Sequence, residues 1–265
     1  MPSPASDPGA LHPALWRAHQ LARAADAALP TGFAALDAQL PGGGWPRRTL
    51  TELLLPHPGV GEMRLLAPAL AAVAGPSAGR SVLLFDPPAE PCAHALWQLG
   101  VDTRQLIVVH GRGGPAAVAP QRLPGRGNPA VHQRLPGADV LWAMEQALRS
   151  GHAGAVLAWL PDGLRADALR RLQLAAQAHD GPAFVLRGIV ARTRPSPAPL
   201  RLALHGAAAV DELSVHVLKR RGPALSQPLR LVLPAVLPPG LKARLRARGA
   251  ARTAQRLPQP AAVAG

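Results

Sequence analysis

The sequence between residues 47 and 75 predicts a strand, a loop and a helix, in that order. The apolar run at 50–55 has the length of a buried strand, and the loop 56–62 is rich in Pro and Gly. Apolar residues within 63–74 recur at the spacing of a helix. The free N–H groups at the start of such a helix can bind a phosphate group. We therefore expect an α/β fold with a nucleotide cradle at this loop.

The loop departs from the phosphate-loop consensus, which is Gly, four residues, Gly, Lys and then Ser or Thr. Gly61 matches the second glycine, but Pro56 replaces the first glycine, Glu62 the lysine and Met63 the hydroxyl residue. A carboxylate repels a triphosphate, and a thioether is a poor ligand for magnesium. Gly59 and Gly61 are therefore predicted to mark a degenerate cofactor site. We expect no catalytic residues, no metal and no bound cofactor, with ATP as the alternative.

The rest of the core alternates between short apolar runs and amphipathic segments. Strands are predicted at 81–86, 106–110, 155–160 and 183–186, and helices at 88–99, 138–150 and 164–179. This alternation implies a mostly parallel sheet flanked by helices. Later runs alternate between apolar and polar residues and predict a late antiparallel hairpin extension; they lie at 200–204, 212–218 and 229–233.

The chain divides into three regions by composition. Residues 1–28 are predicted to form an N-terminal extension with a short amphipathic helix, whose Leu15, Trp16 and Leu21 either pack internally or contact a partner. Residues 29–238 form the core, and within it 111–137 lacks periodicity and is predicted to be a disordered insertion. Residues 239–265 are predicted to form a basic, flexible tail.

The formal net charge of +14 favours an anionic partner, most often nucleic acid, although an Arg-rich and Ala-rich composition also fits a GC-rich genome. With 3% aromatic residues and none in the basic segments, DNA binding is expected to be weak and electrostatic. The candidate DNA or partner contacts are Arg187, Arg192, Arg194, Lys219, Arg220, Arg221, Lys242, Arg244, Arg246 and Arg248.

Other residues bear on disulfides, metal binding and location in the cell. The single Cys92 excludes an internal disulfide, and we expect it to pack in a buried helix. The histidines are scattered without the spacing of metal ligands. Asp162 is expected to cap the helix that follows it. The chain shows neither a long apolar run nor a secretory signal pattern, so we expect a cytoplasmic protein without membrane contact.

The order of these motifs resembles the RecA-type recombinase core over residues 29–233. The strings that carry this resemblance are at 31–37, 42–44, 99–102 and 217–221. Further strings are similar to the family of translesion DNA synthesis-associated proteins ImuA, and they lie at 29–33, 40–46, 51–54, 172–176 and 218–222.

The resemblance implies a RecA-like core and a non-catalytic accessory role in SOS-induced translesion synthesis, an error-prone form of DNA repair. The implied partners are an ImuB-like Y-family polymerase homologue, an error-prone C-family DNA polymerase subunit, RecA and DNA. The segment 11–25 resembles the part of recombinases that docks onto the next subunit.

The resemblance also argues against ATP hydrolysis. The magnesium-facing aspartate of recombinases falls near Trp159 or Leu160, and their γ-phosphate sensor falls near Arg187. Their basic pair survives as Lys219 and Arg221, which would either face a neighbouring subunit across the nucleotide or form a solvated turn.

Two alternatives stay open from the sequence. One is an ATP-binding RecA-like repair ATPase in which Arg64 replaces the missing lysine. The other is a SulA-like cell-division inhibitor that acts by protein contact, since some related sequences carry that name.

Overall fold

The computed structural model describes residues 28–75, 78–111, 133–135, 137–209, 211–223 and 225–236. The predicted N-terminal helix with Leu15, Trp16 and Leu21 lies outside these residues, as do most of the insertion and the basic tail with Lys242, Arg244, Arg246 and Arg248. These expectations therefore stay predictions.

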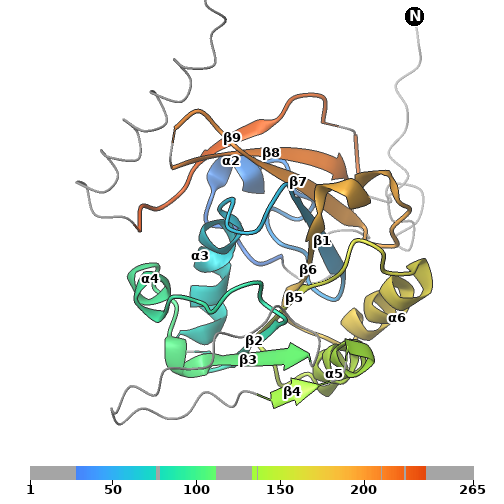
Figure 1. The fold of residues 1–265 in the computed structure, drawn as a ribbon. Helices are drawn as coiled ribbons and strands as arrows, with labels where there is room; N and C mark the ends of the chain where they lie inside the picture. Colours follow the sequence, from blue (N-terminus) through green and yellow to red (C-terminus); the bar gives the residue numbers. More distant parts are fainter. Residues whose placement is uncertain are drawn as a thin grey trace, which may run out of the picture.

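The described residues form a nine-stranded sheet in the order β4-β3-β2-β5-β6-β1-β7-β8-β9 (Figure 1). Neighbouring strands from β4 to β7 run parallel, and β7, β8 and β9 pair antiparallel. The predicted fold class, a mostly parallel sheet flanked by helices with a late antiparallel extension, is confirmed. The strands are β1 (Leu50–Leu55), β2 (Val82–Phe85), β3 (Leu106–Gly111), β4 (Gln133–Leu135), β5 (Ala155–Trp159), β6 (Ala183–Gly188), β7 (Leu200–Gly206), β8 (Glu212–Lys219) and β9 (Leu229–Val232).

Helices cover both faces of the sheet, and a large apolar cluster lies on each face. On one face, α2 (Ala34–Asp37), α3 (Glu62–Ala74) and α4 (Ala93–Gln98) pack against the larger apolar cluster. On the other face, α5 (Gly137–Ser150) and α6 (Ala166–Ala176) pack against a second cluster. The 3-10 helix η3 (Ile189–Thr193) covers part of β1 and β7 on this second face, and η2 (Thr103–Gln105) precedes β3.

Strand β1 lies in the middle of the sheet, between β6 and β7. All six of its residues are buried, which explains why its sequence is almost continuously apolar rather than alternating. Leu53 and Leu55 face α3, while Leu54 packs under η3. Glu52 is the exception in this run, because it is a charged side chain with no exposed surface.

The strand order creates a switch point between β2 and β5. The connections from β1 to β2 and from β2 to β3 pass through α3 and α4 on one face, toward the β4 edge. The connections from β5 to β6 and from β6 to β7 pass through α6 and η3 on the other face, in the opposite direction. In open α/β sheets a crevice forms at such a point, at the carboxyl ends of the strands.

Several predicted boundaries are corrected by the structure. Helix α4 begins at Ala93 rather than at 88, because proline disfavours the helical conformation in the residue before it and this segment holds several prolines. Cys92 lies just before α4 and is exposed rather than buried. Residues 133–135 form β4 beside β3, and α5 begins at Gly137, so the predicted insertion ends earlier than expected.

No helix in the described part of the chain is long and apolar enough to span a membrane.

Candidate functional site

A cavity of about 820 Å³ lies at the carboxyl ends of β1, β2, β3, β5 and β6, which is the position that the switch point predicts. Its lining is mainly apolar and includes Leu55, Val140, Leu141, Trp159, Leu160, Leu164 and Leu186. The polar residues of the lining are His57, Asp86, Asp162 and Arg187. The lining therefore holds two carboxylates, one guanidinium and one imidazole.

Asp86 directly follows β2 and lies in the left-handed backbone region, with φ of 47°. Its side chain accepts a hydrogen bond from the backbone N–H of Gly111 at the end of β3. The carboxylate therefore ties two strand ends together, which is a structural task.

The loop between β1 and α3 has the shape of an anion cradle, but a side chain of the chain itself fills it. The N–H of Gly59 donates to Oε1 of Glu62 at 2.8 Å, and the N–H of Gly61 donates to Oε2 at 3.1 Å. Glu62 is only 3% exposed although it carries a carboxyl group at the start of a helix. The structure thus brings both predicted cofactor glycines together, around a carboxylate.

Arg64 lines a small cavity beside this loop, together with Gly59, Gly61 and Glu62. Its guanidinium pairs with Asp211 at 2.8 Å and donates to the carbonyls of Leu233 and Pro234, next to the ends of β8 and β9. Arg64 could replace the phosphate-loop lysine only by leaving these partners, and this alternative stays a prediction. At the predicted magnesium-facing position, Trp159 places an indole ring in the cavity wall.

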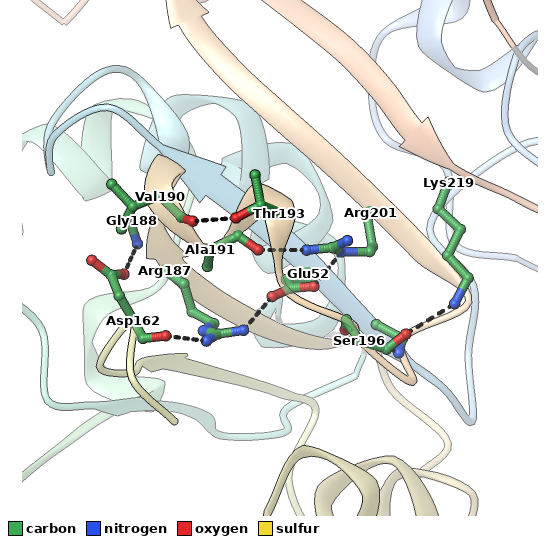
Figure 2. A network of polar contacts seen from close by, with 11 residues as sticks. Glu52, Asp162, Arg187, Gly188, Val190, Ala191, Thr193, Ser196, Arg201 and Lys219 are labelled. Carbon is green, nitrogen blue, oxygen red and sulfur yellow. Dashed lines mark hydrogen bonds and ion pairs between the residues drawn. The ribbon is translucent and has the colours of Figure 1, made fainter. Parts of the chain in front are cut away.

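A buried ion-pair network lies beneath the cavity, on the η3 face of the sheet (Figure 2). Glu52 of β1 accepts hydrogen bonds from Arg187 of β6 at 2.8 Å and from Arg201 of β7 at 2.5 Å. The side chains of Glu52 and Arg187 have no exposed surface, and that of Arg201 is 10% exposed. Arg201 also donates to the carbonyl of Ala191 in η3. The network therefore joins β1, β6, β7 and η3.

Asp162 extends this network instead of capping α6. Its side chain accepts a hydrogen bond from the N–H of Gly188, and its carbonyl accepts one from Arg187. Helix α6 begins at Ala166 after Arg165, with no side-chain cap. The prediction that Asp162 caps α6 is therefore wrong. Its carboxylate instead bonds to Gly188 and links the segment after β5 to the end of β6 (Figure 2).

The expectation of a DNA contact at Arg187 is wrong. The residue belongs to β6 rather than to a basic loop, and its buried guanidinium is bonded to Glu52 and to Asp162. Arg192 and Arg194, in and just after η3, are exposed and stay candidates for phosphate contact.

The basic residues at the end of β8 and just after it lie near the start of β1, whereas the loop with Gly59 and Gly61 follows the end of β1. Lys219 pairs in register with Arg201, near the start of β1, and its ammonium donates to the carbonyl of Ser196. Arg220 donates to carbonyls of Gln39 and Pro223, while Arg221 is exposed. Within one chain these side chains are therefore distant from the loop, and their role toward a neighbouring subunit stays a prediction.

Sequence reasoning missed the buried network, although one signal could have revealed it. Glu52 is a lone charged residue inside an apolar run, and a buried carboxylate requires a partner. The candidate partners were arginines in other apolar strands, namely Arg187 and Arg201. Over the described ranges, no group of three His, Cys, Asp or Glu side chains could hold a metal ion.

A comparison with protein families matches residues 128–183 to the family model described as cell division inhibitor SulA. The matched part runs through β4, α5, β5 and α6 to the first residue of β6, and it contributes the α5 and β5 side of the cavity. The match covers less than half of the chain and supports a connection with the SOS response. No curated protein matches the chain.

Proposed function

We propose that this chain is a non-catalytic protein of the bacterial SOS response that acts by binding other macromolecules. The observation that carries the proposal is the bonding of the Glu62 carboxylate to Gly59 and Gly61, where a nucleotide phosphate would otherwise bind. A second anion at the same N–H groups would have to displace this carboxylate and overcome its charge. The SulA family match supports the SOS context.

Inhibition of cell division is the process that the family match favours. The match covers α5, β5 and α6, which pack together on one face of the sheet. A protein with this role would act by contact alone, in agreement with a cradle closed to phosphate.

Translesion DNA synthesis is the second candidate process, favoured by a separate observation. The strings that resemble the ImuA family are spread from residue 29 to residue 222, and four of the five lie outside the matched segment. In this role the chain would bind an ImuB-like polymerase homologue, an error-prone C-family polymerase subunit or RecA, with its basic surface near DNA.

Nucleotide titration tests the non-catalytic part of the proposal. We expect calorimetry of the purified full chain to show no saturable binding of ATP, with or without magnesium, at millimolar nucleotide. Micromolar binding of ATP that is abolished in the Gly61→Trp variant would overturn the proposal.

Deletion of the gene in its own bacterium separates the two processes. A role in translesion synthesis predicts fewer mutations after ultraviolet damage, with filament length unchanged. A role in division inhibition predicts shorter filaments after damage, with mutation frequency unchanged. A damaged culture that matches the parent strain in both respects would contradict both roles.

A further inference from the structure

Glu62 is held in the loop as a bound anion would be held. Each of its two carboxylate oxygens accepts one backbone N–H, from Gly59 and from Gly61. A phosphate group bound at the start of a helix uses the same arrangement, with oxygens on one centre accepting successive N–H groups. Glu62 is 3% exposed, whereas Gly59 is exposed and Gly61 is half-buried, so the carboxylate is turned from the solvent toward the loop.

The backbone of the loop keeps a shape that requires glycine. Gly59 has φ of 81° and Gly61 has φ of 127°, both in the region that side chains rarely adopt. A Cβ on Gly61 would also approach Cδ1 of Leu233 to 2.8 Å. The loop has therefore kept the conformation that turns its N–H groups inward, even though its lysine and hydroxyl positions hold other residues.

The charge of Glu62 is compensated by the backbone. The carboxylate lies at the N-terminus of α3, a helix of 13 residues, where the helix dipole favours negative charge. The nearest arginine in sequence, Arg64, is committed to Asp211. The loop thus satisfies its N–H groups with one negative charge and no external ligand.

We propose that Glu62 is an internal ligand that occupies the loop in place of a phosphate group and keeps the loop closed to external anions. The inference rests on the proposed function, because it explains how a non-catalytic cradle keeps its shape. Its consequence goes further: removal of this one carboxylate reopens a site for the phosphoryl groups of inorganic phosphate or pyrophosphate.

The Glu62→Ala variant of the full chain tests this proposal, with pyrophosphate as the probe. In calorimetry we expect no saturable binding by the wild-type chain and saturable millimolar binding by the variant, tighter than the wild type by at least about tenfold. Pyrophosphate should also raise the melting temperature of the variant alone. The control is Glu90→Ala, which removes an exposed carboxylate that pairs with His110 rather than with the loop.

Equal affinity of the wild-type chain and Glu62→Ala for pyrophosphate would overturn the inference, as would equal increases in affinity in Glu62→Ala and Glu90→Ala. The proposed function would be contradicted by a different result, namely tight ATP binding by the wild-type chain. If neither protein binds pyrophosphate, the inference fails while the proposed function stands.

Hydrogen exchange gives a readout that does not depend on the alanine variant being folded. In the wild-type chain the amides of Gly59 and Gly61 should exchange more slowly than that of Gly222, an exposed turn glycine. In Glu62→Gln, which keeps the side-chain size but has one acceptor oxygen, one of the two loop amides should lose protection. Fast exchange of both loop amides in the wild type would overturn the inference.

Discussion

At the scale of single residues, buried charge has two different solutions in this chain. Glu62 accepts hydrogen bonds from backbone N–H groups at a helix start, whereas Glu52 forms ion pairs with Arg187 and Arg201. In both cases hydrogen bonds from N–H donors offset part of the cost of burying the carboxylate. The sequence around Glu62 predicted a degenerate phosphate site, which stays a prediction, and no pattern in it indicated that the carboxylate would bond to Gly59 and Gly61.

His179 predicts a pH dependence of stability. The side chain has no exposed surface, and burial, reinforced by the charge of Arg80, lowers the pKa of His179 from 6.5 to about 4. The imidazole of His179 therefore becomes protonated near pH 6.5 in the unfolded chain, but only near pH 4 in the folded chain. The stability from the neutral imidazole is complete above pH 6.5 and disappears as the pH falls from 6.5 to 4.

The decrease should amount to roughly 3 kcal/mol, since one pKa unit corresponds to about 1.4 kcal/mol. Urea unfolding of the wild type and of His179→Asn across this pH range measures it. We expect the asparagine variant to be less stable at pH 7, and the difference to shrink as the solution is acidified. A difference that is the same at pH 7 and at pH 4 would contradict the prediction.

At the scale of elements, the side chain of Glu52 links β1 to its two neighbouring strands, β6 and β7. Replacing Glu52 by Ala leaves Arg187 and Arg201 buried without their carboxylate, so we expect a decrease of about 3–5 kcal/mol in the free energy of unfolding. Denaturant unfolding monitored by tryptophan fluorescence measures the decrease.

The matched control is Asp180→Asn, which breaks the exposed pair with Arg48, whose side chains are 50% and 56% exposed. This change should cost less than about 1 kcal/mol. Similar decreases in Glu52→Ala and Asp180→Asn would show that the network does not stabilise the sheet.

The sequence predicted the strands of the core well because buried parallel strands are short apolar runs, as in β1 and β5. It failed where the cause is not local. β4 is three residues long and exists because the free edge of β3 offers hydrogen bonds. Arg187 was interpreted as a loop residue because only its distant partner Glu52 explains a charged side chain inside β6.

At the scale of the whole molecule, some of the basic side chains that give the net charge of +14 serve internal contacts rather than the surface. Arg64, Arg187 and Arg201 serve ion pairs inside the fold, whereas Arg192 and Arg194 are exposed together at η3. An electrostatic DNA contact is therefore expected at η3 rather than at β6.

The Arg192→Ala, Arg194→Ala double variant tests this surface. For a labelled single-stranded oligonucleotide, the slope of log affinity against log salt should become shallower by about 0.7 for each phosphate that the variant no longer neutralises. Fluorescence anisotropy at several salt concentrations gives the slope. Arg104→Ala is the control, because Arg104 is exposed but paired with Asp102. An unchanged slope in the double variant would remove η3 from the DNA surface.

The position of Cys92 has a practical consequence. This exposed thiol is the sole cysteine of the sequence, and it borders a second cavity of about 230 Å³ whose wall includes Gly59, Gly61 and Glu62. A maleimide dye attached there would label the native chain at one defined point, with no cysteine to remove beforehand. Its emission would report the opening of the loop in real time, so that even a brief exit of the Glu62 carboxylate becomes visible by spectroscopy.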